Sequence, residues 1–356
     1  MGGKEEERPN RDTSEALCKG FRFIMASISV ALCVCDLLAA PAYLLLTAVV
    51  LASIVSPVLR DLSSHGKIRS GVTPTRSTSN KAQHVGCSAP PTFIHRLCRF
   101  VTTSEIFLVE KRLFLHFYIA GIFFAAALWI RGQSGTSGDH VLGLNDVPAL
   151  LFVVHLCRRA YECVYVHAWG NGKMHVGGYV LGVLHYAFVP FVVIGSEWCC
   201  DDDFARNPAP SATQMALGAL LCCYGQAQQY IHHKILSDLR KGDTVSSRAQ
   251  YSIPRGHWFN TVSSPHYLAE ILIYVAFAIM LHPLHTKLTL CDTFFHPNSH
   301  LATSCAFGLQ RYKHLILCLW VATNLTVSAR SSHSWYLHRF GSKYPKNRQA
   351  IIPLIF

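Results

Sequence analysis

Three clusters of ionisable side chains interrupt apolar stretches of this sequence, and they are its clearest candidates for chemistry. The segment VVHLCRRAYECVYVHAW carries His155, Arg158, Arg159, Glu162 and His167 among apolar residues. Ionisable groups inside a membrane span are costly and mark functional sites by default. Arg158 and Glu162 are four residues apart, so a helix lets them form an ion pair. Arg159 points elsewhere on that helix, and we expect it to have no partner there.

The other two clusters follow farther along the chain. In QAQQYIHHKILSDLR, polar residues recur at helical spacing on one side: Gln226, Gln229, His233 and Arg240. In QYSIPRGHWFNTVSSPHYLAEILIY, Pro254 and Gly256 break the backbone before an apolar segment that contains Glu270. Burying this carboxylate alone would cost several kcal/mol, so Glu270 needs a hydrogen-bond donor or a proton. A polar pocket among apolar helices is therefore expected.

The elements that position these clusters are predicted to be membrane-spanning helices. The chain is 51% hydrophobic and 15% charged, whereas soluble domains carry about 25% charged residues. A span needs roughly 20 apolar residues. We predict about seven, the first within Phe21–Leu59, either one long tilted helix or a hairpin broken near Pro41. The others are about Leu113–Ile130, Val147–His167, His175–Ser196, Thr213–Leu236, His266–His285 and Lys313–Arg330.

The distribution of Lys and Arg predicts the orientation in the membrane. If Phe21–Leu59 crosses once, alternate connections hold 20 basic residues on one side and 4 on the other. The positive-inside rule then places the basic connections and the C-terminus in the cytosol. The formal net charge of +12 is concentrated on that face, where it would attract anionic lipid or a polyphosphate cofactor. No basic helix or aromatic platform suggests a nucleic-acid partner.

A composition shift near residues 60–95 predicts a flexible loop. We expect residues 1–112 to form an N-terminal membrane segment followed by this basic loop, and residues 113–356 to form one membrane domain that carries the polar clusters. A cleavable signal peptide is not expected, because the first twenty residues are mixed in charge and the following apolar run is too long. Fourteen cysteines include no CxxC pair, and most are interpreted as small packing residues. Only Cys199 and Cys200, in an acidic loop, suggest a lumenal disulfide.

Four blocks of sequence resemble the steroid 5-alpha-reductase family, within it the polyprenal reductase branch. They are HLCRRAYECVYVH, HKILSDLR, YSIPRGHWFNTVSSPHYLAEILIY and YPKNRQAIIPLIF, and EKRLFLHFYIAGIF is a weaker match. The resemblance implies an all-α membrane helical bundle with an NADPH cavity that opens to the cytosol. It also explains why no strand-associated GxGxxG is needed for a nicotinamide enzyme.

The resemblance implies a set of cofactor contacts at matching motif positions. These are Arg159, Arg240, Tyr251, His266, Glu270, His333 and Tyr336. Two positions differ in type, since His266 stands where the steroid enzymes have Asn and Ser252 where they have Arg. Leu156 occupies the position of their substrate-binding Tyr. The absence of that phenol favours a substrate other than a steroid.

The implied reaction is reduction of the alpha-unsaturated double bond of polyprenal, on the route to dolichol phosphate and protein N-glycosylation. An isolated alkene cannot hold the negative charge that hydride addition leaves, whereas a conjugated aldehyde can. Hydride would add to the beta carbon, and the enolate would then be protonated at the alpha carbon. Donors to the aldehyde oxygen would stabilise the enolate. The candidate catalytic residues are Glu270, His155, His233 and Tyr267.

Several alternatives remain beside this interpretation. A 3-oxo-steroid 4-ene 5-alpha-reductase is the first, and an isoprenylcysteine-type methyltransferase has a similar C-terminal region. Twenty histidines raise a di-iron membrane oxygenase, but no HxxHH box occurs, and we expect no metal. A transporter or scaffold would explain the hydrophobicity but not the polar clusters. The expected location is the endoplasmic reticulum membrane, with the bilayer and a polyisoprenoid lipid as partners.

Overall fold

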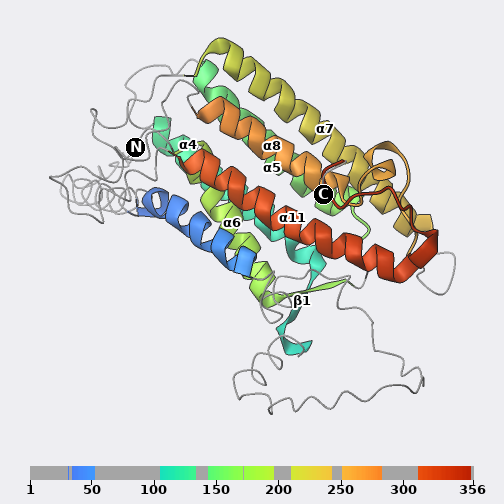
Figure 1. Ribbon diagram of the computed structural model, residues 1–356. Helices are drawn as coiled ribbons and strands as arrows, with labels where there is room; N and C mark the ends of the chain where they lie inside the picture. The colour runs from blue at the N-terminus through green and yellow to red at the C-terminus, as the bar shows by residue number, and fades with distance from the viewer. Residues whose placement is uncertain are drawn as a thin grey trace, which may run out of the picture.

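The computed structural model describes residues 31, 34–52, 105–133, 143–170, 172–195, 210–242, 251–282 and 312–353. Within these ranges, helices of 15 residues or more lie side by side in one elongated bundle (Figure 1). They are an N-terminal helix (Val34–Ala52), α4 (Phe114–Gln133), α5 (Val147–Tyr161), α6 (Val176–Val193), α7 (Ala212–Gly242), α8 (Pro265–Leu281) and α11 (Lys313–Phe340). The fold is all-α, as predicted.

Short elements connect these helices at the ends of the bundle. The strands β1 (Leu108–Glu110) and β2 (Lys173–His175) pair antiparallel, with Val109 opposite Met174. A π-helix, η4 (Glu162–Val166), continues directly from α5. The 3-10 turns are η1 (Glu105–Phe107), η2 (Lys111–Leu113), η3 (Leu144–Asp146), η6 (His257–Asn260) and η7 (Gly341–Lys343).

Hydropathy and length identify this chain as a multi-pass membrane protein. Three described segments are long and apolar enough to cross a bilayer: Val34–Ala52, Lys111–Gly132 and Val176–Val193. The apolar helix α8 has 17 residues and carries Glu270 of the third polar cluster, while the first two clusters lie on α5 with η4 and on α7. Outward-facing side chains on α7 are still apolar, since Leu217 and Leu220 are 60% and 70% exposed. The total of about seven spans remains a prediction.

Two helices are longer than the spans predicted for them. With 31 residues, α7 extends about 46 Å at 1.5 Å per residue, which exceeds a hydrocarbon core of roughly 30 Å. The helix α11 continues to Phe340, ten residues past the predicted end at Arg330. His333 and Tyr336 therefore lie on this helix and not in a tail after it.

The N-terminal helix shows whether the chain turns back near Pro41 within the first apolar run. It passes through Pro41 without interruption from Val34 to Ala52. A hairpin broken near Pro41 was therefore the wrong alternative for this part of the run. The remainder of Phe21–Leu59 lies outside the described residues, as do Cys199 and Cys200.

Small residues let the central helices approach closely. A Cβ atom added at Gly218 of α7 would collide with Met280 of α8, and one at Gly225 would lie 2.9 Å from Ile273. Between α4 and α6, a Cβ at Gly182 would come within 2.5 Å of the Phe117 ring. Glycines at such positions are typical of helix interfaces in membranes, where close backbone packing drives association.

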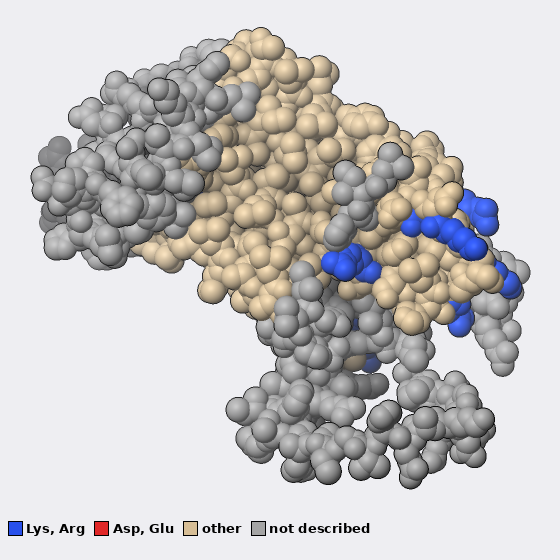
Figure 2. All heavy atoms as spheres, in the orientation of Figure 1, with Lys and Arg blue, Asp and Glu red and all other residues tan. Residues whose placement is uncertain are grey.

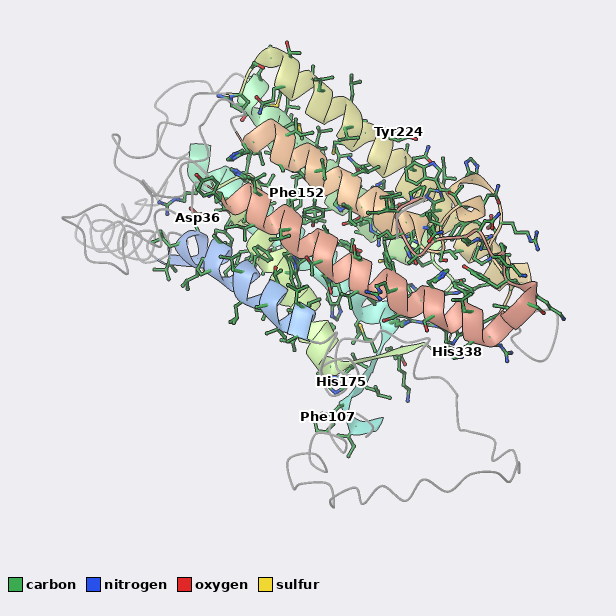
Figure 3. All side chains as sticks on the ribbon, in the orientation of Figure 1. Asp36, Phe107, Phe152, His175, Tyr224 and His338 are labelled. Carbon is green, nitrogen blue, oxygen red and sulfur yellow. The ribbon has the colours of Figure 1, made fainter. Side chains whose placement is uncertain are left out.

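A buried ion pair joins the first and last helices. Lys313 Nζ, at the start of α11, donates to Asp36 Oδ1 of the N-terminal helix at 2.8 Å. The two residues are 4% and 6% exposed. Figure 3 shows Asp36 at the opposite end of the bundle from His338, which lies near the end of α11. The pair therefore fastens the N-terminal helix to α11 far from the polar clusters.

Candidate functional site

The Glu162 carboxylate is the centre of a buried polar network. Arg158 Nη1 donates to Glu162 Oε1, and Arg159 Nη1 donates to Oε2. His233 Nδ1 of α7 lies 2.7 Å from Oε2, and Arg159 Nη2 donates to the Tyr118 hydroxyl of α4 at 2.7 Å. The predicted Arg158–Glu162 pair is confirmed. The expectation that Arg159 has no partner on its helix is wrong, because it shares the same carboxylate.

The second carboxylate, Glu270 of α8, is joined to this network through Gln229. The Gln229 side-chain amide donates to Glu270 Oε2, and its carbonyl oxygen accepts a hydrogen bond from Arg158 Nη2. His155 Nε2 lies 3.5 Å from Glu270 Oε1. The donor that burial of Glu270 required is therefore present. Two carboxylates and two guanidiniums balance one another, which a buried cluster of charges needs for stability.

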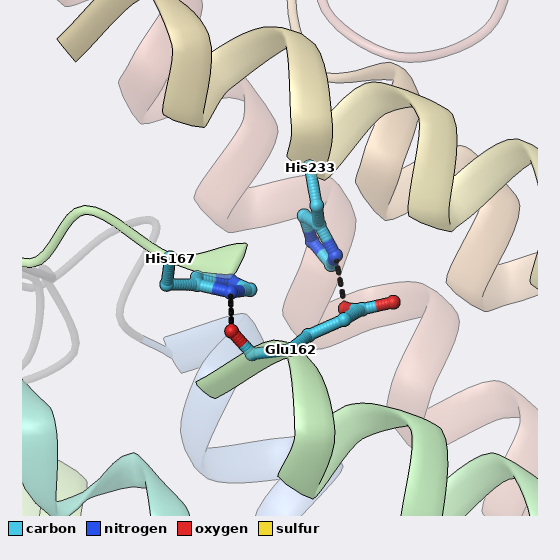
Figure 4. Close-up of side chains that lie close together, drawn as sticks. All are labelled: Glu162, His167 and His233. Carbon is cyan, nitrogen blue, oxygen red and sulfur yellow. Dashed lines mark hydrogen bonds and ion pairs between the residues drawn. The ribbon is translucent and has the colours of Figure 1, made fainter. Parts of the chain in front are cut away.

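Glu162, His167 and His233 also lie close enough together to suggest a metal site (Figure 4). Their geometry favours hydrogen bonding instead. His167 Nδ1 donates to the Glu162 carbonyl oxygen at 2.8 Å, and His233 Nδ1 faces the carboxylate. Because Arg158 and Arg159 both contact this carboxylate, a divalent cation there would be repelled by two nearby guanidiniums.

A cavity of about 610 Å³ lies beside the network, within the usual size range of ligand pockets. Its polar wall includes Arg159, Gln229, His233, Arg240 and Glu270. Its apolar wall comes from α4, α6, α11 and the N-terminal helix, through residues that include Val49, Val50, Phe117, Leu181, Trp320 and Val321. One cavity therefore offers both hydrogen-bonding groups and a surface suited to a lipid.

The polar end of the cavity lies at the C-terminal end of α7. Arg240 Nη1 donates to the Ala168 carbonyl oxygen at 2.7 Å, while Ser237 Oγ donates to the Val166 carbonyl oxygen at 2.5 Å. Figure 2 shows Lys and Arg side chains on the visible face gathered near the end where α7 and α11 finish, without acidic residues among them. This end of the bundle therefore favours an anionic group.

The C-terminal segment, residues 344–353, packs against the part of the cavity wall that contains Ser263. Ser263, a cavity residue, forms hydrogen bonds through Oγ with His333 Nδ1 and with the Tyr344 hydroxyl, both at 2.6 Å. The backbone N–H of Ser263 donates to the Gln349 carbonyl oxygen at 2.8 Å. Burial raises the pKa of Tyr344 above its usual value, so this phenol stays protonated. The YPKNRQAIIPLIF motif thus fixes the loop that precedes α8.

Most of the residues singled out from the sequence meet at this cavity. Those that line it are Arg159, His233, Arg240, His266, Tyr267, Glu270 and Tyr336. His155 is fully buried behind Glu270, and His333 reaches the wall only through Ser263. Tyr251 is 40% exposed and its ring meets the edge of Trp335. Leu156 is buried in the core, where a Cβ on Gly121 would touch it.

Several polar cavity residues were not singled out by the sequence reasoning, and two of them lie in one block of sequence. Tyr118 and Lys111 both line the cavity, and both belong to EKRLFLHFYIAGIF, which was judged the weaker block. A tyrosine in an apolar run resembles ordinary core packing, so no local pattern distinguishes Tyr118. The only signal that could have identified Tyr118 was the weaker match of EKRLFLHFYIAGIF to the family.

Comparisons with known proteins identify the family of this chain. The family model for 3-oxo-5-alpha-steroid 4-dehydrogenase matches residues 183–300 and 303–356. Human polyprenal reductase is 30% identical over 276 residues, which cover 70% of this chain and 78% of that protein. The chain belongs to the steroid 5-alpha-reductase family. Polyprenal reductase from Xenopus laevis is 27% identical over 336 residues (85% and 87%), and polyprenal reductase 1 from Arabidopsis thaliana is 26% identical over 296 (71% and 83%).

These relatives place the chain in the polyprenal reductase branch of the steroid 5-alpha-reductase family. The match to the family model covers α7, α8, α11 and the C-terminal segment. It begins after α5, so Arg158, Arg159 and Glu162 lie outside the matched stretch. The structure connects the two regions, because Arg158 of α5 bonds Gln229 of α7 and Glu162 of η4 contacts His233 of α7.

Proposed function

We propose that this protein reduces the alpha-unsaturated double bond of polyprenal with NADPH, giving dolichal, the precursor of dolichol. Membership in the steroid 5-alpha-reductase family supports an oxidoreductase that acts on a carbon–carbon double bond. The names of the relatives support polyprenal as the substrate. By this proposal the protein serves dolichol-phosphate synthesis and so protein N-glycosylation.

The observation that carries the proposal is the shape of the cavity. A hydride transfer from a dinucleotide to an isoprenoid requires one space with a charged part and an apolar part. Here Arg159, Glu270 and Arg240 face the same cavity as Val50 and Val321. The N-terminal helix and α11 supply the apolar side, which suits a lipid chain that extends into the bilayer.

The residues at the polar end fit a dinucleotide phosphate. The exposed Arg240 side chain uses Nη1 for Ala168, so its other N–H groups can donate to phosphate oxygens. Lys111 lines the same cavity and adds a second cation. We propose that Arg240, His266, Tyr336 and Glu270 contact the cofactor, with Arg159 held beside it. Tyr251 and His333 would act from just outside the cavity wall.

NADPH would supply hydride, and the protein would supply orientation and charge. Hydride adds to the beta carbon of the enal, and the electron pair of the double bond moves toward the aldehyde oxygen. The resulting enolate then takes a proton at the alpha carbon. Glu270, fixed by Gln229 and His155, would stabilise the positive charge that develops when hydride leaves. Exclusion of water by the apolar wall strengthens this electrostatic effect.

The decisive assay supplies the purified full-length protein with NADPH and one of three lipids. These are polyprenal, polyprenol and a 3-oxo-4-ene steroid. We expect saturated product from polyprenal, and none from polyprenol alone because an allylic alcohol cannot accept the charge. Reduction of the steroid in preference to polyprenal would contradict the proposed substrate. No oxidation of NADPH with any of the three lipids would contradict the proposed reaction.

Arg240 is proposed to contact the 2′-phosphate that distinguishes NADPH from NADH. Replacing it with alanine should raise the apparent KM for NADPH by about 10-fold or more, because charge-assisted hydrogen bonds to a guanidinium are lost. The KM for NADH should change much less. Steady-state kinetics with both cofactors measure this difference.

The exposed Arg339, in the last turn of α11, provides a matched control for that measurement. It lies at the same end of the bundle but does not line the cavity, so Arg339→Ala should leave both KM values near those of the wild type. If Arg240→Ala instead raises the KM for NADPH and the KM for NADH equally, Arg240 does not contact the 2′-phosphate.

We also propose the endoplasmic reticulum membrane as the location, with the cavity opening toward the cytosol. The Lys and Arg side chains at one end of the bundle support this orientation through the positive-inside rule. Cytosolic access suits a water-soluble cofactor. Labelling of a cysteine introduced next to Arg240 in intact microsomes would test it, since a membrane-impermeant reagent should react without permeabilisation.

A further inference from the structure

The group that stabilises the substrate's aldehyde oxygen can be chosen from the hydrogen bonds around the cavity. We propose that Tyr118 of α4 is a catalytic residue that donates its phenol hydrogen to this oxygen as the enolate forms. This inference rests on the function proposed above. It adds a residue from a helix that precedes the stretch matched by the family model.

The direction of one hydrogen bond leaves the Tyr118 proton available. Arg159 Nη2 lies 2.7 Å from the Tyr118 hydroxyl, and a guanidinium can only donate. The phenol oxygen is therefore the acceptor, and its own hydrogen must point to another group. Tyr118 and Tyr186 both line the cavity, with ring centroids 4.8 Å apart, so a ligand in the cavity competes with the Tyr186 hydroxyl for this hydrogen. The positive charge of Arg159 also makes the phenol a stronger donor.

Other candidates at the cavity are less suitable. His233 Nδ1 lies 2.7 Å from Glu162 Oε2 and 2.8 Å from Arg159 Nη1, so this nitrogen is engaged in the buried network and not with a ligand. Tyr267 stacks beside His266, with ring centroids 4.2 Å apart, and has no comparable cation at its oxygen among the described contacts. His155 lies behind Glu270 and does not line the cavity.

The phenol of Tyr274 provides an informative comparison. Trp320 Nε1 donates to His185 Nδ1 at 3.2 Å, and indole is only a donor, so His185 carries its proton on Nε2. That proton reaches the Tyr274 hydroxyl at 3.3 Å. Tyr274 thus also has an available hydrogen, but a long contact from a neutral imidazole activates it less than a guanidinium activates Tyr118.

The proposed step balances without a further reagent. Hydride from NADPH forms the new C–H bond at the beta carbon, and the double bond shifts to become an enolate whose oxygen accepts the Tyr118 hydrogen bond. A water molecule at the polar end of the cavity then gives a proton to the alpha carbon and leaves as hydroxide, and the carbonyl re-forms. The cofactor is oxidised to NADP⁺, and the enal gains two hydrogens. Tyr118 ends the cycle in its original protonation state.

The test replaces Tyr118 with phenylalanine in the full-length protein in lipid nanodiscs. Loss of one donor to a developing oxyanion typically lowers kcat by 100- to 1,000-fold, so we expect polyprenal turnover to fall by about 100-fold. NADPH affinity, measured by its fluorescence, should remain within about threefold. Tyr179→Phe is the control, because the Tyr179 hydroxyl of α6 bonds His116 of α4 at 2.8 Å and does not line the cavity.

A second substrate separates catalysis from a structural effect. A nitroalkene with the same isoprenoid tail holds negative charge on its nitro group and needs less help from a donor. The Tyr118→Phe defect should shrink below about 10-fold with this compound. An equal defect with both substrates, or polyprenal turnover within threefold of wild type, would overturn the role of Tyr118. If the wild type itself reduces neither compound, the proposed function fails, and this inference fails with it.

Discussion

Replacing Glu270 with glutamine is expected to lower the turnover of polyprenal about 100-fold while the protein remains folded. The substitution keeps the shape and a hydrogen bond to Gln229 but removes the negative charge that faces the cavity. That charge is worth most in the transition state, where positive charge develops on the hydride donor. The measurement is kcat with saturating NADPH, together with thermal unfolding of the detergent-purified protein.

Glu110→Gln is the matched control for this change. Glu110 is an exposed carboxylate at the end of β1, and it does not line the cavity, so turnover should stay at the wild-type level. Normal turnover in Glu270→Gln would exclude Glu270 from the site. A lowered unfolding temperature with proportional loss of folded protein would instead indicate a purely structural role.

Glu162→Gln is expected to destabilise the protein by about 3–5 kcal/mol. Glu162 is fully buried and neutralises both Arg158 and Arg159. Removing its charge leaves two guanidiniums beside one another with Glu270 as the remaining carboxylate of the network. Thermal unfolding in detergent should show a large drop in Tm, and NADPH binding should weaken because Arg159 and His233 lose their positions.

An exposed ion pair of the same spacing provides the control. Lys234 Nζ lies 2.7 Å from Asp238 Oδ1, four residues along α7, with both side chains at least half exposed. Solvent-exposed pairs contribute roughly 0–1 kcal/mol, so Asp238→Asn should shift Tm little. A similar Tm for the Glu162 and Asp238 variants would mean that the buried network does not hold α5 against α7.

Hydropathy was sufficient to locate the helices, because each apolar run must bury its backbone polar groups within a helix. The ends of the long helices were harder to predict. The segment SARSSHSWYLHRF has no apolar stretch, so it resembled a tail, although it continues α11 to Phe340. Because these side chains are mostly polar, hydropathy gives no signal that the helix continues through them.

The convergence of the site could be predicted only in part. The polar stripe on α7 was visible in the sequence, and the structure places Gln226, Gln229 and His233 against α5. Arg159 was missed as the second partner of Glu162, because helical spacing was applied to one ion pair at a time. Contacts between helices, such as Arg159 with Tyr118, depend on tertiary packing and leave no trace in local spacing.

The ion pair between Asp36 and Lys313 has a consequence for biosynthesis. Its members are separated by 277 residues, so the ribosome delivers the carboxylate of the first helix long before the amine of the last one. Until translation reaches Lys313, that carboxylate lacks this ion-pair partner, whereas Tyr43 of the same helix can already bond the His185 carbonyl oxygen of α6. The apolar wall of the cavity, which needs both the N-terminal helix and α11, is therefore completed late in assembly. Chains that end before Lys313 should be degraded faster than the full-length protein.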